Sequence, residues 1–404
     1  MIVGLDIGRS CAVAAALDQF PPNPKRYFNE YRRDFVRLNT SIDGMEKLLS
    51  LNPTGLVMEP TGNWYSAFWR EFARSVKIPI YWVGHADLSH QRGSYGFNNK
   101  RDDEDAFCLA LCYFDDRFID IHGRKRFLQI EPGTISVIRQ KFLELEQIDK
   151  NRTILVNQLR QRLTLEFPEI ATRQFKASEK LGFTPVLGAL AGIHTYTRLE
   201  NELSSSVTQT LGIEISDFSR DHAAAICQLE QREKKTLGEL TSLLGKSEFS
   251  SYLKVFQHFG FGVRMQALML SAVYPFEKFL IDGKRHIEWE EDRNGKLQKR
   301  DRSLRSFQAY MGLSYSLKQS GDKKSKSFHG STLVRSHLYV WALAKIAPQP
   351  PKRLDTNIGN ILGEKFDTLR NLDSPIPGKD SFTRVLFQAT RLMFRELRRE
   401  LHFD

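Results

Sequence analysis

A single acid interrupts the first apolar segment of the chain, and it constrains the fold more than any other feature. Asp6 stands in residues 2–8, where every other residue is apolar or glycine. Burying a lone carboxylate in such a strand costs several kcal/mol unless the charge is paired or binds a metal ion. A second apolar run, residues 55–59, also ends in an acid, Glu59, directly before Pro60. We therefore expect a functional reason for both acids.

The order of expected elements in the first 125 residues is strand, hairpin, strand, and then alternating helices and strands. This order is typical of the ribonuclease-H-like fold, in which helices accompany a mixed sheet. We therefore predict an α/β fold for this part of the chain. The expected strands are residues 2–8, 11–17, 32–38, 55–59 and 78–83, and the expected helices are residues 44–51 and 64–76, with a third after Asp102.

Four acids open the helical run that follows Arg101. Asp102 and Asp105 are three residues apart, so they share one face of a helix and can present two carboxylates to one point. Mg²⁺ prefers such oxygen ligands. The alternative is that acids in a first turn complement the helix dipole and bind no metal.

The other charges of this stretch have simpler expected roles. Asp103 and Glu104 lie off the shared face, and we expect both to be solvated. Lys100 and Arg101 are expected either to contact phosphate or only to offset the neighbouring acids.

From about Gly133 the pattern changes to long amphipathic helices, predicting an all-α region. Two apolar series at three- and four-residue steps, residues 135–163 and 226–244, are separated by an irregular segment, residues 184–219. They predict an antiparallel helical hairpin within one chain or a dimerising coiled coil, and the sequence leaves both open.

The C-terminal third combines charged loops with helices. Residues 283–305 are highly charged and predict a surface insertion, with a β-hairpin around Asn294-Gly295. Ser320-Gly321 is expected in a basic loop, and a last basic amphipathic helix is expected over residues 382–399. The lysines of that loop, expected to bind nucleic acid, are Lys318, Lys323, Lys324 and Lys326.

Composition supports folded domains and a polyanionic partner. The chain is 41% hydrophobic, and its formal net charge of +11 favours nucleic acid over an anionic membrane. The four cysteines form no CxxC pair, and Cys108 and Cys112 have the spacing of core residues on one helix. Reduced thiols, the lack of a signal peptide and the lack of a long apolar run predict an intracellular protein outside the membrane.

Three N-terminal islands resemble the DEDD-type insertion-sequence transposases, a family that includes the pilin-gene invertase and bridge-RNA-guided recombinases. They are Gly4-Leu5-Asp6-Ile7-Gly8, Met58-Glu59-Pro60-Thr61-Gly62-Asn63-Trp64 and Lys100-Arg101-Asp102-Asp103-Glu104-Asp105-Ala106. Their spacing is also similar to that of the family. A fourth island, Gly312-Leu313 followed by Ser320-Gly321, resembles the signature of the family's second domain.

The resemblance implies four parts for the chain. Residues 1–127 would form a RuvC-like, ribonuclease-H-like catalytic domain with a mixed sheet, and residues 128–250 a helical or coiled-coil region. Residues 251–347 would form a small, mostly helical transposase domain with the serine. Residues 348–404 would form a basic helical tail.

The resemblance also implies a chemistry. Asp6, Glu59, Asp102 and Asp105 would bind Mg²⁺ or Mn²⁺, and Ser320 would attack a DNA phosphate to form a phosphoserine link. The implied function is a DNA transposase or site-specific recombinase guided by a bridging non-coding RNA. It would act on donor and target DNA as a homodimer or homotetramer in a prokaryotic cytoplasm, associated with the nucleoid.

Several alternatives remain open at this point. Ser314, Ser316, Ser325 and Ser327 compete with Ser320 for the role of nucleophile. The enzyme could instead be a Holliday-junction-type endonuclease that uses metal-activated water, or a degenerate transposase that only binds nucleic acid. An actin-like kinase also begins with a strand and Asp-x-Gly, but the sequence lacks the second phosphate-binding turn and the adenosine motif of that class.

Overall fold

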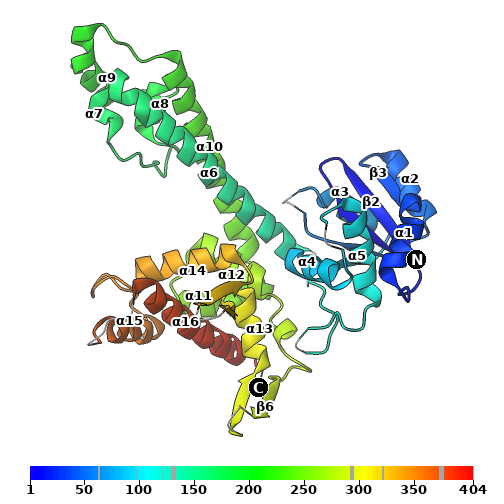
Figure 1. The fold of residues 1–404 in the computed structure, drawn as a ribbon. Coiled ribbons are helices and arrows are strands. Elements are labelled where there is room, and N and C mark those ends of the chain that lie inside the picture. The colour runs from blue at the N-terminus through cyan, green and yellow to red at the C-terminus, as the bar shows by residue number, and fades with distance from the viewer. Residues whose placement is uncertain are drawn as a thin grey trace. The chain divides into compact units, whose positions relative to one another are not determined.

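We describe the chain from a computed structural model that covers residues 1–61, 64–97, 99–120, 122–128, 133–291, 295–320, 323–372 and 377–403, with backbone alone for residues 317–326. The chain divides into two compact units (Figure 1). The first unit consists of Met1–Glu131 and His286–Arg302, and the second consists of Pro132–Arg285 and Ser303–Asp404.

The first unit contains a five-stranded mixed sheet, as the sequence predicts. Strand order is β3-β2-β1-β4-β5, with β2 antiparallel to both β1 and β3, and with β4 parallel to both β1 and β5. The strands are β1 (Ile2–Ile7), β2 (Cys11–Leu17), β3 (Val36–Asn39), β4 (Gly55–Met58) and β5 (Ile80–Trp82). The expected third strand began too early, because Arg32–Asp34 form the 3-10 turn η1.

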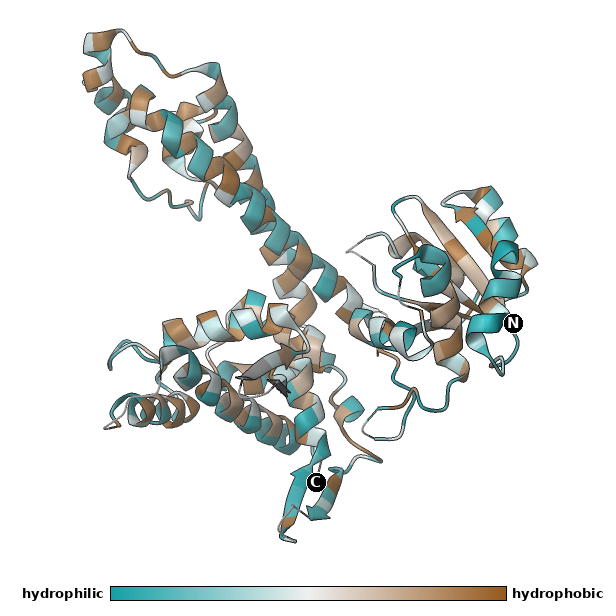
Figure 2. Cartoon of the chain, viewed as in Figure 1, coloured by the Kyte–Doolittle hydropathy of each residue, from teal (hydrophilic) through white to brown (hydrophobic). Residues whose placement is uncertain are grey.

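Helices pack against both faces of this sheet. One core joins the sheet to α5 and the other joins it to α2 and α3. Figure 2 shows the strands mostly in pale and brown tones, which marks them as the apolar layer. The helices are α1 (Pro24–Tyr31), α2 (Ile42–Ser50), α3 (Ala67–Ser75), α4 (His85–Ser94) and α5 (Asp102–Phe114). The helices α1 and α4 were not predicted, and α3 begins three residues later than expected.

The charged insertion forms the predicted β-hairpin. Its strands are β6 (Ile287–Glu291) and β7 (Leu297–Asp301), and Asn294 of the expected turn lies outside the described residues. His286, at the base of the hairpin, hydrogen-bonds His122 of the same unit through their Nδ1 atoms at 2.8 Å.

The second unit begins with a long antiparallel helical hairpin (Figure 1). Helix α6 (Thr134–Glu166) packs along α10 (Asp217–Leu244), which is one of the two arrangements that the sequence left open. The connection forms a tip with its own apolar core, which includes Leu163, Phe167 and Ile226. The tip elements are α7 (Pro168–Ala171), α8 (Pro185–Leu190), α9 (Thr197–Ser204) and the 3-10 turn η2 (Val207–Leu211).

The rest of the second unit packs around the base of that hairpin. One apolar core joins the ends of α6 and α10 to the C-terminal helices, including those of the expected basic tail. These helices are α11 (Ser250–His258), α12 (Val263–Val273), α13 (Arg302–Tyr310), α14 (Thr332–Lys345), α15 (Asn357–Arg370) and α16 (Gly378–Glu400), with the 3-10 turns η3 (Ser247–Phe249) and η4 (Phe276–Phe279). Strands β8 (Ser314–Ser320) and β9 (Lys323–His329) form a hairpin that lies between α13 and α14 in the sequence.

Two further predictions concern the thiols and the membrane. All four cysteines are free thiols, with Cys108, Cys112 and Cys227 buried and Cys11 half-buried. No helix in the described ranges is both long enough and apolar enough to cross a membrane.

Candidate active site at the edge of the sheet

The parallel pairing of β1 and β4 brings the first two candidate acids to the same edge of the sheet. The register aligns Leu5 with Met58, so the next residues lie side by side: Asp6, near the end of β1, and Glu59, directly after β4. Asp6 is half-buried, and the Glu59 side chain is 16% exposed. The edge therefore holds two carboxylates on neighbouring strands, as their positions in the sequence suggested.

A glycine in β1 brings the other two acids over the same edge. A Cβ atom at Gly4 would lie 2.0 Å from the Ala106 carbonyl oxygen and 2.5 Å from the Ala110 nitrogen, so only glycine lets α5 approach this strand so closely. Asp6 follows two residues after Gly4 on the same face of the strand. The first turn of α5, with Asp102 and Asp105, precedes Ala106, and this places both acids near Asp6.

The electrostatics show that these four acids lie close together. The pKa of the Asp6 carboxyl rises to about 7, first because it is buried and then because Asp105, Glu59 and Asp102 repel its charge. Lys100 opposes this rise. We call Asp6, Glu59, Asp102 and Asp105 the carboxylate cluster, and the structure gathers all four predicted members.

Two basic side chains that the sequence analysis missed contact the cluster. Arg92 of α4 donates to Asp105 at 2.5 Å, and the Asp105 side chain is only 6% exposed. Burial raises the pKa of Asp105, while Arg92 works against that rise. His85, the first residue of α4, hydrogen-bonds the Glu59 carboxylate through Nδ1 at 2.8 Å.

A sequence signal for these two residues did exist. His85 follows β5, the next parallel strand after β4, so it leaves the sheet at the same edge as Glu59. Arg92 is seven residues later, which is about two helical turns and so nearly the same face of α4. A basic residue just after a parallel strand can therefore be expected to contact an acid that follows the neighbouring strand.

The expected solvation of Glu104 is wrong, and that of Asp103 holds only in part. Glu104 is 6% exposed, its Oε2 atom is buried without a hydrogen-bond partner among the described residues, and burial raises its pKa. Asp103 is half-buried and accepts a hydrogen bond from Arg101 at 2.9 Å. Among the four acids of this first turn, only Asp102 is exposed.

The chemistry of the cluster fits a hard divalent cation, although the side chains are not arranged around one. Oxygen-only donors, two of them (Asp6 and Asp105) with pKa values raised by burial and by neighbouring acids, are what Mg²⁺ or Mn²⁺ would neutralise. Within the described ranges, however, no three Asp, Glu, His or Cys side chains already form a metal cage. Arg92 and His85 hold two of the carboxylates instead, so a cation would have to displace or rearrange these contacts.

The predicted basic loop around Ser320 is instead a β-hairpin, and that expectation is corrected. The pairing runs from Ser314 with His329 to Ser320 with Lys323, so Ser320 is the last residue of β8. Its side chain lies outside the described part of the structure, as do those of the four lysines; Gly321 is outside entirely. We call β8 and β9 the serine hairpin. The carboxylate cluster and the serine hairpin belong to different units.

One competing serine on the serine hairpin has a partner that the sequence did not indicate. The Ser316 hydroxyl hydrogen-bonds Nε2 of His329 at 2.7 Å, and both side chains are accessible to solvent. A histidine beside a hydroxyl can act as a base toward it. Ser316 is therefore the strongest described competitor of Ser320.

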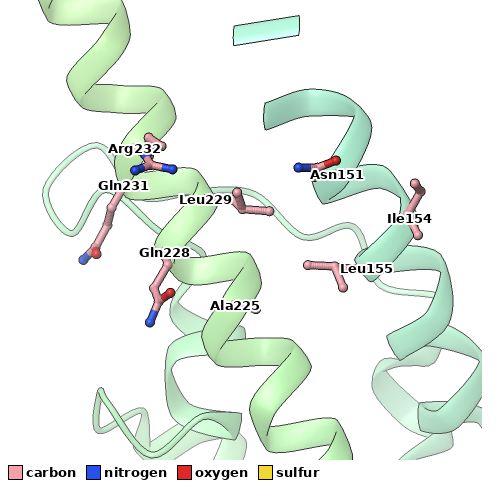
Figure 3. Close-up of a pocket in the computed structure, with 8 residues that line it drawn as sticks. All are labelled: Asn151, Ile154, Leu155, Ala225, Gln228, Leu229, Gln231 and Arg232. Carbon is pink, nitrogen blue, oxygen red and sulfur yellow. The ribbon is translucent and has the colours of Figure 1, made fainter. Parts of the chain in front are cut away.

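A hollow of about 670 Å³ lies between α6 and α10 (Figure 3). It is lined by Asn151, Ile154 and Leu155 of α6 and by Ala225, Gln228, Leu229, Gln231 and Arg232 of α10. No acid, cysteine or histidine is among these residues, so the hollow offers neither a metal site nor a general acid or base.

Comparison with known proteins matches the C-terminal region of the chain. Residues 295–355 match the sequence model of the transposase IS116/IS110/IS902 family. The match supports a transposase of insertion elements, a DNA-processing enzyme. The matched segment runs from β7 through the serine hairpin and α14, and it includes Gly312-Leu313 and Ser320-Gly321. A search of curated proteins found no match.

Proposed function

We propose that this transposase is a site-specific recombinase that cuts and exchanges DNA strands at the carboxylate cluster. The proposal rests on the convergence of Asp6, Glu59, Asp102 and Asp105 in a chain whose C-terminal region matches a transposase family. The strand order β3-β2-β1-β4-β5 supports a ribonuclease-H-like, RuvC-like assignment for the first unit. In that fold class, acids at one edge of a mixed sheet act on phosphodiesters.

The four acids of the cluster would hold Mg²⁺ or Mn²⁺. When bound, the cation would polarise a phosphoryl oxygen and stabilise the charge on the leaving oxygen. Arg92 and His85 would keep Asp105 and Glu59 in place when no cation is bound, because each already hydrogen-bonds one of these carboxylates. Lys100, exposed beside the cluster, would attract a phosphate.

Ser320 is the proposed nucleophile. Its Oγ would replace one oxygen on phosphorus, giving a phosphoserine ester and a free strand hydroxyl, and the reverse step with a second strand would rejoin the DNA without ATP. Because Ser320 and the cluster belong to different units, this mechanism needs both units, from one chain or from two copies in a homodimer or homotetramer. A bridging non-coding RNA would select the donor and target DNA.

A second function remains in competition, because the carboxylate cluster by itself is sufficient for a simpler reaction. A metal-dependent endonuclease would use water as its nucleophile and would leave Ser320 without a role. Its products would be free strand ends, with no DNA attached to protein.

A cleavage assay tests the proposed function. The purified chain is incubated with supercoiled plasmid that carries the element's ends, with and without element RNA, in Mg²⁺, Mn²⁺ or EDTA. We expect nicked or recombined products only with a divalent cation. Products in EDTA, or none under any condition in which DNA is bound, would contradict the proposal.

A further inference from the structure

The last long helix of the chain, α16, buries all but one narrow face. Its apolar side chains belong to the core of the second unit, with Phe382, Val385, Ala389, Met393 and Leu397 among those buried. Their three- and four-residue spacing fixes the orientation of the helix about its axis. The residues on the remaining face are therefore held toward solvent by the packing of the whole unit.

That remaining face is almost purely arginine. The exposed residues from position 384 onward are Arg384, Arg391, Arg395 and Arg399, followed by His402 just after the helix. Their steps of seven, four and four residues keep them on one side of the helix, with the half-buried Gln388 between the first two. We call these four arginines the arginine face.

The acids of α16 do not cancel this charge. Asp380, exposed in the first turn, supplies one negative charge one turn before Arg384, against the four arginines of the face. Glu396 is 8% exposed and is shared by Arg395 and Arg399, so one carboxylate serves two guanidinium groups. Glu400 is paired with Lys254 of α11 at 2.8 Å. Arg395 and Arg399 remain 63% and 71% exposed despite their ion pairs. The face thus keeps a net positive charge along its length.

The dimensions of the face suit a polyphosphate backbone. From Arg384 to Arg399 the helix rises about 22 Å, at about 1.5 Å per residue. A duplex places one phosphate of each strand about every 3.4 Å along its axis, so about six base pairs match this length. Arginine also binds phosphate in a bidentate manner, and a helix fixed by its core loses little backbone freedom on binding.

The composition of the face favours a duplex over a single strand. Single-stranded nucleic acid is normally held by aromatic side chains on which the bases stack. None of the large exposed apolar side chains of the described structure lies in α16, and its phenylalanines are buried or half-buried. The face therefore offers charge without stacking surfaces.

We propose that the arginine face of α16 binds the phosphate backbone of double-stranded DNA. This inference rests on the proposed function, because it assigns a DNA-holding surface to that enzyme, away in sequence from both the carboxylate cluster and Ser320. Contacts of this kind position the duplex and are independent of base sequence.

The test compares two variants that lose the same charge. The first is Arg384→Gln/Arg391→Gln/Arg395→Gln, and the control is Lys150→Gln/Lys235→Gln/Lys365→Gln, whose lysines are exposed on α6, α10 and α15. Binding to fluorescein-labelled DNA and RNA duplexes of 30 base pairs is measured by anisotropy in EDTA between 50 and 300 mM KCl. Circular dichroism melting checks that each variant folds.

For the arginine variant we expect about a 100-fold loss of affinity and a salt slope, in log K against log [KCl], that is smaller by about three. The control should lose less than about threefold, with nearly the wild-type slope. If the triple variant melts early, Arg384→Gln/Arg391→Gln replaces it and should lower the slope by about two.

Other outcomes would contradict either the arginine face alone or the proposed function as well. Equal losses in the two triple variants, or an unchanged slope in the arginine variant, would overturn the arginine face while leaving the recombinase proposal standing. A loss confined to an RNA duplex of the same length would also overturn it. Wild-type protein that binds no DNA at 50 mM KCl would overturn the proposed function together with this surface.

Discussion

The carboxylate cluster and the serine hairpin are proposed as two halves of one active site, yet the molecule specifies them very differently. The cluster is fixed by buried contacts: the parallel register of β1 with β4, the close approach of α5 at Gly4, and the contact of Arg92 with Asp105. The serine hairpin is a two-stranded ribbon of mostly polar residues, and the side chains at its turn are not described.

This difference separates a site that packing fixes from a segment whose role rests on likeness to a family. Packing determines the positions of the cluster side chains, so their chemistry can be argued from geometry. The serine hairpin lies inside the segment that matches a transposase family, so its role is argued from that likeness. Experiments on the two regions therefore test different claims.

The largest expected effect comes from removing a charge from the carboxylate cluster. Asp102→Asn should lower Mg²⁺-dependent strand cleavage by at least about 1,000-fold, since it removes a charged ligand from the cluster. Asp6→Asn, Glu59→Gln and Asp105→Asn should do the same, whereas Asp103→Asn should stay near wild type because its partner is Arg101. Equal losses from Asp102→Asn and Asp103→Asn would show that the wrong helix face was chosen.

The next effect concerns the packing that assembles the cluster. Gly4→Ala would push α5 off β1 and should lower the free energy of unfolding by about 3 kcal/mol, with cleavage lost as well. Gly93→Ala in α4, where an added Cβ meets nothing within 4 Å, is the control and should stabilise by about 0.5 kcal/mol. Urea unfolding followed by circular dichroism measures both free energies of unfolding. Equal stability of the two variants would contradict the close packing of α5 on β1 at Gly4.

A smaller effect is expected from the lysines of the serine hairpin. Lys323→Glu/Lys324→Glu should weaken binding to DNA of any sequence by about 10-fold and lower the salt slope, through the loss of phosphate contacts. Anisotropy titrations at several KCl concentrations measure this. An affinity that does not depend on salt would exclude a phosphate-dominated interface.

The smallest effect is a pH dependence. The pKa of Asp6 is about 7 in the folded protein against an ordinary value of 3.8, so the folded state holds this proton more tightly than the unfolded state does. Stability should therefore fall as pH rises from about 4 to 7 and then level off. In EDTA, the melting temperature of Asp6→Asn relative to wild type should rise by roughly 2–5 °C between pH 5 and pH 8. A constant difference across this range would show that neither burial nor the neighbouring acids raise the pKa of Asp6 in the folded protein.

Much of the first unit was predictable because its elements follow strong local rules. The residues of β2 were predicted without error, and α5 begins at Asp102 as expected, since its acids suit a helix N-terminus. The meeting of Asp6 and Glu59 follows from two acids at the ends of apolar strands. The bounds of β2 and the start of α5 required no knowledge of distant contacts, whereas the meeting of Asp6 and Glu59 also depends on the pairing of β1 with β4.

The errors arose where tertiary contacts decide. Glu104 was expected in solvent because its helical position lies off the Asp102–Asp105 face, but that side of α5 is also covered, in the unit where α4 packs against α5. The serine hairpin was not predicted, because its lysines suggested a basic surface loop. Tyr315 and Leu317 nevertheless alternate with polar residues, as residues in a strand do. The contacts of His85 and Arg92 follow from the position of α4 directly after β5, and this signal was not used.

One measurement tests the central claim most directly: detection of a covalent protein–DNA adduct and identification of the attached residue. Wild-type protein is incubated with plasmid substrate, element RNA and Mg²⁺, quenched in denaturant and analysed by peptide mass spectrometry. We predict DNA on Ser320, with Ser320→Ala losing both adduct and cleavage but retaining DNA binding, and with Ser316→Ala and Ser325→Ala behaving like wild type. Undiminished nicking by Ser320→Ala would show that water is the nucleophile, and an adduct on Ser316 would transfer the role to the serine that contacts His329.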